Sequence, residues 1–196
     1  RADAHLHRGL ALKPATIAEH FNLATLLLDQ DRLTDAVACL KDIVTRHPQS
    51  VEAHVRLGRA CRRANDPDGM LAAANAGLRL EPNHPILHLL ASEAHFDRGE
   101  LKEGWHDYRW RFQSTENRVL GKNYPLSVWQ GEDLKERGLL VWTEQGPGDE
   151  ILYANMLGDL AARAKRCAVQ CSPRLAPLFK RAFPNVTVFD RDLNAD

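Results

Sequence analysis

The positions of apolar side chains divide the chain into a long helical stretch and a shorter stretch of strands and helices. Over about the first 113 residues, apolar residues recur three and four positions apart, as on the buried face of an amphipathic helix. The first clear block contains Phe21, Leu23, Ala24, Leu27 and Leu28, and then, after the polar Asp31 and Arg32, Val37, Leu40, Ile43 and Val44. This pattern predicts two antiparallel helices joined by a short turn.

A spacing of 34 residues runs through this helical stretch. Three prolines follow it, Pro14, Pro48 and Pro82. Three histidines follow it as well, His20, His54 and His88. Small residues recur in the same phase at Ala24, Gly58 and Ser92, where we expect the two helices of one repeat to approach closely. Two helices in 34 residues is the period of the tetratricopeptide repeat (TPR), so the sequence resembles a TPR array.

Helix-start signals lie where this period requires them. Thr16 with Glu19 forms a capping box, Asp66 caps a helix whose first residue is Pro67, and Pro85 starts another helix. We therefore predict repeats at 17–50, 51–84 and 85–115, preceded by the second helix of an earlier repeat at 2–13, in an array that covers residues 1–117. Because the pattern opens on half a repeat and on Arg1 rather than Met, we expect the chain to be a segment of a longer protein.

The third repeat ends in an aromatic run and has Glu116 where the period calls for proline. The run consists of Trp105, Tyr108, Trp110 and Phe112. Large rings are chiefly core material, and a solenoid needs an end cap, so we expect these rings to pack at the end of the array rather than to bind a ligand.

Known TPR arrays bind extended peptides or helices in a concave groove lined by the first helix of each repeat. The resemblance assigns this groove to Asn22, Thr25, Arg56, Arg59, Arg63, Glu93 and Asp97. Asn22 matches the asparagine ladder that holds a substrate peptide's backbone in the O-linked N-acetylglucosamine transferases. Arg56 and Leu90 interrupt the ladder at the equivalent positions here.

Arg56, Arg59 and Arg63 are predicted to share one helix face. Their planar guanidinium groups suit carboxylates or phosphates of a partner. The alternative is a solvated face in which Glu52 pairs with Arg56 and neighbouring acids neutralise the rest, since exposed charge runs are often no more than that.

The pattern changes after a predicted linker at 118–137. Strands are expected at 139–142, 167–171 and 186–189, with helices at 151–164 and 173–182, the second capped by Ser172. This order predicts a partial Rossmann-like βαβαβ unit within 138–196. The predicted fold class is therefore α plus α/β: an all-α TPR superhelix followed by this unit.

The loop after the first predicted strand, residues 144–150, contains Gly146, Pro147 and Gly148 and lies where open α/β sheets bind ligands. Its glycines let backbone approach a substrate, and it matches neither a Walker loop nor a dinucleotide-binding fingerprint. On these grounds alone, Asp149 is either a first-turn acid favoured by the helix dipole or a site residue.

The stretch from Trp129-Gln-Gly-Glu-Asp-Leu through Glu144-Gln-Gly-Pro-Gly-Asp-Glu-Ile to Tyr153-Ala resembles bacterial TPR proteins that continue into a heptosyltransferase-like glycosyltransferase domain. In heptosyltransferases the matching aspartate acts as general base on the acceptor hydroxyl. The resemblance makes Asp149 the candidate base and makes Glu144, Gln145, Gly146 and Gly148 candidate substrate-binding residues. Pro147 departs from the aliphatic residue usual at its position.

Two functions follow from these resemblances. The first is a TPR-guided glycosyltransferase, for instance of flagellin, whose array binds a protein acceptor. The nucleotide sugar would need a second Rossmann half that these 196 residues lack, so we expect this segment to be inactive by itself. The alternative is a non-catalytic TPR adaptor for protein–protein interaction. Sequence downstream of Asp196 would discriminate the two.

Composition bears on whether the chain binds nucleic acid, a membrane or a metal. Equal numbers of basic and acidic residues, 26 each, give no whole-chain field that would attract nucleic acid or an acidic membrane. No apolar run approaches the roughly 20 residues of a membrane span. Cys39, Cys61, Cys167 and Cys171 lack metal-site or disulfide-scaffold spacing, which favours a cytoplasmic protein without metal or cofactor. The periodic histidines lie on separate repeats, about 10 Å or more apart, too far to share one zinc.

Overall fold

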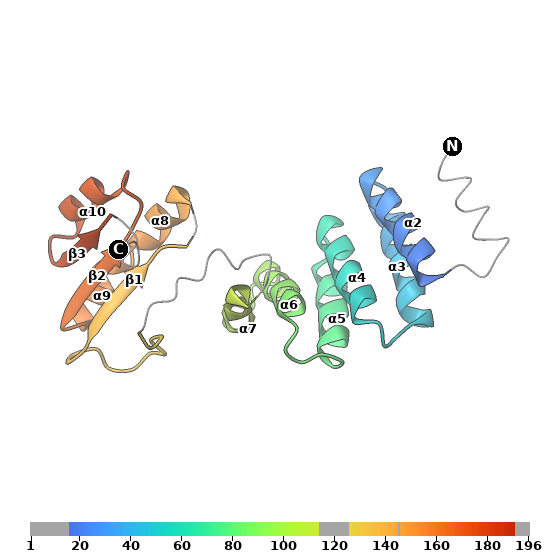
Figure 1. Ribbon diagram of the computed structural model, residues 1–196, viewed down its shortest axis with the longest axis horizontal. Coiled ribbons are helices and arrows are strands. Elements are labelled where there is room, and N and C mark those ends of the chain that lie inside the picture. Colours follow the sequence, from blue (N-terminus) through green and yellow to red (C-terminus); the bar gives the residue numbers. More distant parts are fainter. Residues whose placement is uncertain (1–15, 114–125, 145, 191–196) are drawn as a thin grey trace. The chain divides into compact units, whose positions relative to one another are not determined.

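The computed structural model describes residues 16–113, 126–144 and 146–190, and the chain divides into two compact units, 1–118 and 119–196. The predicted half repeat at 2–13, the first part of the predicted linker and Gln145 lie outside the described residues. The helical unit is coloured blue to green in Figure 1, and the sheet unit yellow to red.

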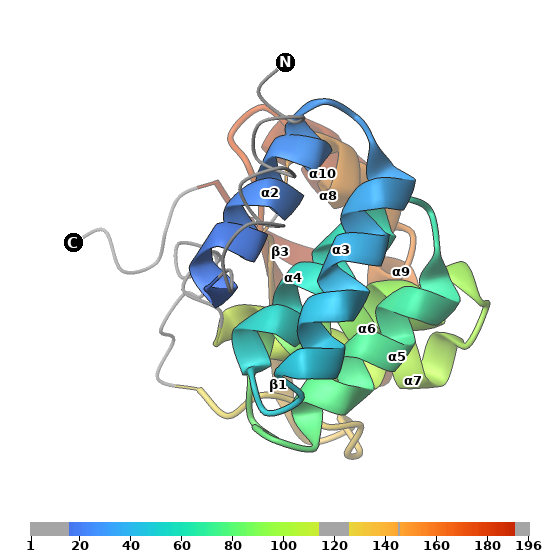
Figure 2. The same ribbon diagram turned by 90° about the vertical axis from the view of Figure 1, so that its right-hand side faces the viewer.

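The first unit is a row of paired helices. The pairs are α2 (Ile17–Asp29) with α3 (Leu33–Arg46), α4 (Val51–Arg63) with α5 (Pro67–Leu78), and α6 (Pro85–Asp97) with α7 (Leu101–Tyr108), followed by a 3-10 turn, η1 (Arg109–Phe112). Consecutive helices pack side by side (Figures 1 and 2). The predicted row of antiparallel helix pairs is therefore confirmed from Ile17 to Phe112.

Local capping explains where α2, α5 and α6 begin. Thr16 and Glu19 form the predicted reciprocal capping box at α2. Asp66 caps α5 by accepting a hydrogen bond from the Gly69 amide at 2.8 Å. At α6, Pro85 is the first helical residue as predicted, and the His84 ring is the cap. These caps satisfy amide groups that would otherwise lack a partner at a helix start.

The larger hydrophobic core of the array runs between its helices. It buries residues from all three pairs, including Leu40 and Ile43 of the first, Met70 of the second and Leu87 and Leu90 of the third. Because each pair contributes to a core shared with its neighbours, its stability depends on those neighbours.

Gly58 brings together helices of different repeats, which differs from the expectation that it separates the two helices of one repeat. A Cβ added at Gly58 would lie 2.8 Å from Leu90 Cδ1, on α6 of the following pair. Ser92 does lie between the helices of its own pair, where its hydroxyl donates to the Gly104 carbonyl of α7 at 2.9 Å.

The second unit is a three-stranded parallel sheet in the order β1-β2-β3. Its elements are β1 (Gly138–Trp142), α8 (Pro147–Ala154), α9 (Leu157–Arg163), β2 (Arg166–Gln170), α10 (Ala176–Ala182) and β3 (Val186–Phe189). Cys167, Val169 and Val186 of the sheet pack with Leu157 and Phe179 of the helices in a separate core. The strand order agrees with the predicted βαβαβ unit, and its reading as a Rossmann half remains an interpretation.

Two predicted helices of this unit differ from those observed. The single helix expected at 151–164 is two helices, α8 and α9, which meet at Asn155 and Met156. The helix expected from Pro173 begins at Ala176 instead, after a turn in which the Ser172 carbonyl accepts from the Leu175 and Ala176 amides. Ser172 is thus not the side-chain cap, and its buried hydroxyl has no hydrogen-bond partner among the described residues.

Candidate functional site

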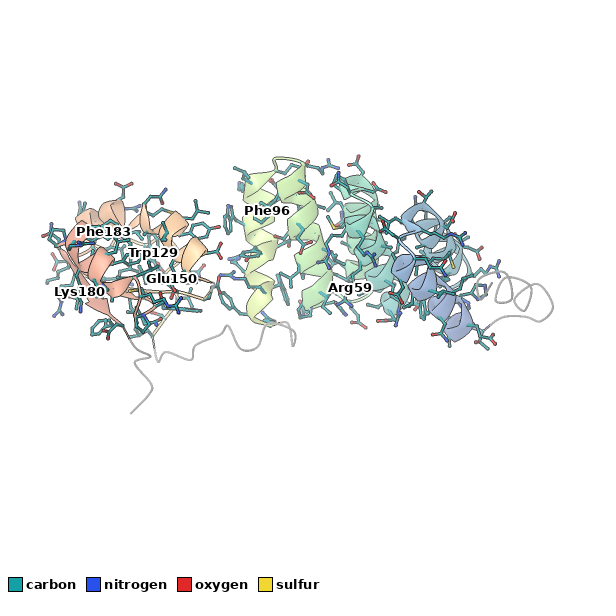
Figure 3. The ribbon with its side chains drawn as sticks, turned by 90° about the horizontal axis from the view of Figure 1, so that it is seen from above. Arg59, Phe96, Trp129, Glu150, Lys180 and Phe183 are labelled. Carbon is teal, nitrogen blue, oxygen red and sulfur yellow. The ribbon has the colours of Figure 1, made fainter. Side chains whose placement is uncertain are left out.

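The first helices of the three pairs, α2, α4 and α6, carry all seven predicted groove residues. Asn22, Thr25, Arg63 and Asp97 are exposed, whereas Arg56, Arg59 and Glu93 are half-buried. The Thr25 hydroxyl donates to the Phe21 carbonyl of its own helix at 2.9 Å. Figure 3 shows Arg59 on α4, the middle of the three helices. The structure therefore places the seven residues on three neighbouring helices.

Two of the three predicted groove arginines contact the preceding repeat. Arg56 pairs with Glu52, which is the alternative raised by the sequence, and its guanidinium lies 4.5 Å from the centre of the Phe21 ring on α2. Arg63 donates to the Leu28 carbonyl near the end of α2 at 2.8 Å. A cation at the C-terminal end of a helix is favoured by the helix dipole. These arginines therefore hold α4 against α2.

Two further arginines join neighbouring repeats, and sequence reasoning missed both. Arg62 of α4 pairs with Glu93 of α6 at 3.2 Å, and Arg98 after α6 pairs with Asp68 of α5. Their partners are 31 and 30 residues away. The sequence does show that each arginine and its acidic partner are separated by slightly less than one repeat. This spacing indicates a contact only once the packing of the helices is known.

Two of the three periodic histidines contact the loops between repeats. His54 Nε2 lies 3.0 Å from the Pro48 carbonyl oxygen, and His88 Nε2 lies 2.9 Å from the Pro82 carbonyl oxygen. Each contact joins the first helix of a repeat to the proline that closes the repeat before it. Among the residues that the structure describes, no three histidine, cysteine or acidic side chains form a cluster able to hold a metal ion.

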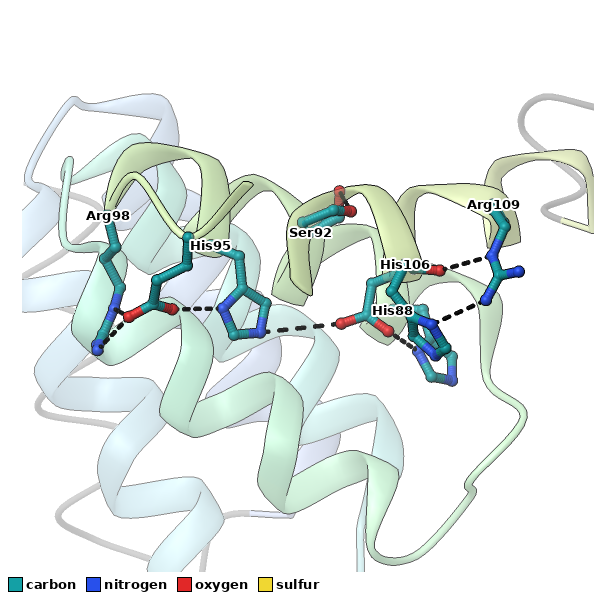
Figure 4. A network of polar contacts seen from close by, with 9 residues as sticks. His88, Ser92, His95, Arg98, His106 and Arg109 are labelled. Atoms are coloured by element: carbon teal, nitrogen blue, oxygen red, sulfur yellow. Dashed lines mark hydrogen bonds and ion pairs between the residues drawn. The ribbon is translucent and has the colours of Figure 1, made fainter. Parts of the chain in front are cut away.

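A network of polar contacts links α6 to α7 (Figure 4). Asp107 of α7 lies between two α6 imidazoles, 2.8 Å from His88 Nδ1 and 3.9 Å from His95 Nε2. His95 Nδ1 in turn lies 2.6 Å from Glu100, which also accepts from Arg98. The side chains of His88, His95 and Asp107 are each about one-sixth exposed. This network is therefore largely shielded from water.

The aromatic residues at the end of the array pack mainly on one another. Phe96 of α6 meets Trp105 and Tyr108 edge to face, with ring centres 5.0 and 6.1 Å apart. Trp110 stacks on His88 at 4.2 Å. Trp105 nevertheless remains 48% exposed. The rings thus close the third repeat, as an end cap requires.

The second candidate region is the loop between β1 and α8. Gly146, Gly148 and Asp149 are exposed, Glu144 is half-buried, and Gln145 lies outside the described residues. Asp149 is in the first turn of α8, where the helix dipole favours an acid, but it makes no side-chain cap. A Cβ added at either glycine would meet nothing within 4 Å. Neither glycine is thus needed for packing in this unit.

Glu150, which sequence reasoning passed over, is the buried acid of this region (Figure 3). It is 7% exposed, and its carboxylate accepts from the Ser172 amide at 2.9 Å, which joins α8 to the loop after β2. Burial, and secondly the Glu150 carboxylate, raise the pKa of the Cys171 thiol. The sequence did contain a signal for this burial. Glu150 is spaced four and seven residues from Ala154 and Leu157, which are the other buried residues of α8 and α9, so helical periodicity places it on their face.

The cysteines are free thiols, as expected, and three of the four are buried. Cys39 is half-buried. Burial raises the pKa of Cys61 to about 11. Such a thiol is almost wholly protonated near neutral pH and is a poor nucleophile.

In the described parts of the chain, no helix is long and apolar enough to cross a membrane.

Part of the helical unit matches a known repeat family. Residues 21–85 match the tetratricopeptide repeat family. Protein FlbA of Caulobacter vibrioides is 26% identical over 216 residues, a match that covers 90% of this chain and 36% of FlbA. The chain therefore spans about a third of that relative's length.

Solved structures agree on the fold. A crystal structure of MamA is 18% identical, with a TM-score of 0.54, covering 60% of this chain and 69% of MamA. MamA of Desulfovibrio magneticus RS-1 is also 18% identical, with a TM-score of 0.50, covering 56% of this chain and 62% of that one. Likeness at this identity shows the fold alone. The helical unit thus shares the fold of these structures, and residues 21–85 within it match the tetratricopeptide repeat family.

Proposed function

We propose that this chain is a scaffold for protein–protein interaction, and that its TPR array binds a segment of a protein partner across α2, α4 and α6. The observation that carries this proposal is the set of exposed polar residues on three consecutive first helices. Asn22 and Thr25 offer hydrogen bonds, while Arg63 and Asp97 offer charges. A partner backbone needs such groups because it loses its hydrogen bonds to water on binding.

The charges on these helices change sign along the array. Asp29 and Asp31 lie at the end of α2, Arg59 and Arg63 lie on α4, and Asp97 ends α6. Arg63 contacts Leu28 and Asp31, and Arg59 lies one turn before it on the same helix, so both place positive charge near the middle of the array. Charge patterns of this kind mainly set partner choice and association rate.

Site-directed photo-crosslinking tests the proposed surface. A photoreactive amino acid at Asn22 or Thr25, on α2, is expected to capture the partner in cells, and the same amino acid at the exposed Thr45 of α3 is the control. The captured protein is then produced and its affinity measured directly. Equal capture from Thr45 would contradict the proposal, because that residue lies on a second helix of a pair.

Charge reversal then tests the preference. Arg59→Glu is expected to weaken binding of the captured partner by about tenfold or more, since loss of a hot-spot residue costs about 2 kcal/mol or more and about 1.4 kcal/mol is a factor of ten. Lys41→Glu on α3 is the matched control and leaves the affinity unchanged. Melting curves of both variants show whether the array remains folded.

Glycosyl transfer is the narrower candidate. It is favoured by the exposed Asp149 beside two glycines that packing does not require, just beyond the carboxyl end of β1. None of the relatives reported above is named as a transferase. In the full-length protein, Asp149→Asn is expected to lower sugar transfer by about 100-fold or more if Asp149 is a general base. Absence of transfer by the unaltered full-length protein, assayed with nucleotide sugars, would remove this candidate.

A further inference from the structure

The outer face of α7 keeps large apolar side chains in contact with water. The aromatic rings close the core of the third repeat, but Leu101 is 59% exposed and Trp105 is 48% exposed. The two residues are four apart in α7 and therefore lie on the same side of the helix. The last helix of a solenoid usually presents a polar outer face. The end of this array instead presents an apolar stripe.

The position of Trp105 is covered in the two earlier repeats. Leu71 of α5 and Val37 of α3 stand one and two repeat lengths before it. Val37 belongs to the hydrophobic core, and Leu71 packs against that core. A further helix pair follows each of these helices, and its first helix packs on α3 or on α5. Within the described part of the array, no further pair follows α7. The apolar stripe therefore has the place and the character of a surface that receives a helix.

A row of basic side chains borders the stripe. Lys102, His106 and Arg109 follow one another at intervals of four and three residues, and all three are exposed. Arg109 comes four residues after Trp105, so the row runs next to the stripe. The Arg109 guanidinium donates to the ring and to the carbonyl of His106 (Figure 4). Among the described residues, neither Lys102 nor Arg109 pairs with a carboxylate.

The acidic side chains of α7 face away from this row. Asp107 lies against α6, 2.8 Å from His88. Glu103 follows Trp105's side of the helix by about half a turn and is exposed on the opposite side. The stripe thus has a basic edge that suits carboxylates of a partner. The same face of a second copy of this chain would bring further basic residues rather than carboxylates.

We propose that the outer face of α7 is a docking site for an amphipathic helix of a partner protein, one that carries acidic side chains beside its apolar stripe. Burial of Leu101 and Trp105 supplies most of the affinity, because covering exposed apolar area is favourable. The basic row selects the partner and fixes its orientation through charge complementarity. This face belongs to the second helix of a pair, so it goes beyond the surface of α2, α4 and α6 proposed above.

Two synthetic helical peptides test the docking site on the whole 196-residue chain. Both carry the same stripe of leucines at helical spacing, and they differ only in the row beside it, which is glutamate in one peptide and lysine in the other. Fluorescence anisotropy of the labelled peptides measures their affinity. The glutamate peptide is expected to bind about tenfold or more tightly than the lysine peptide, because the basic row attracts the first and repels the second.

Substitutions then locate the binding. Leu101→Glu is expected to weaken binding of the glutamate peptide by about tenfold or more, since it removes an apolar contact and adds a like charge. Leu152→Glu, at a leucine of similar exposure on α8, is the matched control and leaves the affinity unchanged. Lys102→Glu with Arg109→Glu is expected to reverse the preference, so that the lysine peptide binds more tightly. Melting curves show whether each variant remains folded.

Four results would overturn the docking site: no saturable binding of the glutamate peptide, equal affinity for the two peptides, an unchanged affinity in Leu101→Glu, or an equal loss in Leu152→Glu. Dimerisation of the chain that Leu101→Glu abolishes, measured by sedimentation, would assign the face to a second copy instead. If the double variant does not fold, Leu101→Glu and its control decide alone. Photo-crosslinking from Asn22 or Thr25 reports on the other surface, and its failure leaves these readings unaffected.

Discussion

Small residues set how closely neighbouring helices of the array approach. Beyond Gly58, a Cβ added at Gly77 of α5 would lie 2.6 Å from Leu87 Cδ1, and one added at Gly104 of α7 would lie 2.5 Å from Phe96. Real Cβ atoms essentially never make such contacts, so a larger residue at either position must displace a packed side chain. The close approach of α5, α6 and α7 thus depends on glycine at these positions, because its side chain is a single hydrogen atom.

Gly58→Leu is expected to destabilise the array by about 1 to 3 kcal/mol, the usual cost of overpacking a filled core. The new side chain would displace Leu90, which is 2% exposed and has little room to move. Thermal unfolding followed by helical circular dichroism measures the effect. Ala38→Leu, at an exposed position of α3, is the control. Identical melting of the two variants would show that α4 and α6 do not meet at Gly58.

Individual contacts were predictable only where they are local. The capping box of Thr16 and the pair of Glu52 with Arg56 join residues three or four apart, and helical geometry brings such residues together in any helix. The contacts of Arg63 with Leu28 and of Arg98 with Asp68 depend on how one helix crosses another. The histidine period was visible in the sequence, but the carbonyl groups that it meets were not.

The starts of α2, α4, α5 and α6 are encoded by the capping residue before each helix, whereas the break between α8 and α9 has no such local signal. Neither Asn155 nor Met156 is a helix breaker, and both lie within a continuous apolar pattern. The buried residues Ala154 and Leu157 lie on either side of the break, in the core of the sheet unit. Packing against the sheet therefore overrides local preference here, which is why the sequence predicted one continuous helix.

Asp66→Ala is expected to destabilise the second repeat by about 0.5 to 2 kcal/mol, because the Gly69 amide loses its partner at the start of α5. Pro67 would keep its favourable first-turn position. Asp66→Asn retains an acceptor oxygen and is expected to recover most of the loss. Denaturant unfolding of the two variants tests this, and equal midpoints would show that the side chain does not cap α5.

Glu100→Gln is expected to lower the melting temperature at pH 7 more than at pH 3. A hydrogen bond from His95, and secondly one from Arg98, lower the pKa of the Glu100 carboxyl in the folded protein. A lowered folded pKa gives stability that is present above the ordinary pKa of glutamate and is lost as pH falls through the lowered value.

Glu103→Gln, on the exposed side of α7, is the control for this variant. An equal decrease in melting temperature at both pH values would indicate that Glu100 acts through packing rather than through its charge.

At the scale of the whole molecule, the buried apolar residues of the array helices and those of the sheet unit belong to separate clusters that share no residue among those described. Among the described residues of the array, the well-exposed large apolar side chains are Leu101 and Trp105. Unit 119–196 presents more of them on α8 and just after it, including Ile151, Leu152 and Met156. Hydrophobic periodicity predicted the helices and the strands. It does not predict which apolar side chains stay exposed, because that depends on whether another helix or sheet packs on the same face.

Residues 1–118 produced alone are expected to fold and to unfold cooperatively, because their core lies wholly within them. Residues 119–196 alone are expected to bind an apolar dye such as anilinonaphthalene sulfonate, and Leu152→Lys should weaken that binding. Circular dichroism and dye fluorescence provide the measurements. A fragment 1–118 without helical structure would contradict the division into two units.

The arginine contacts between repeats give the helix pairs a fixed order. The residue that stands 34 positions after Arg63 is Asp97, so the third pair lacks the cation with which the second pair binds the end of α2. Were recombination to delete the middle module, Asp97 would come to face Asp31 and the Leu28 carbonyl, and like charges would repel across the new junction. The helix pairs are thus not interchangeable, because the contacts at each junction match only the pair that precedes it.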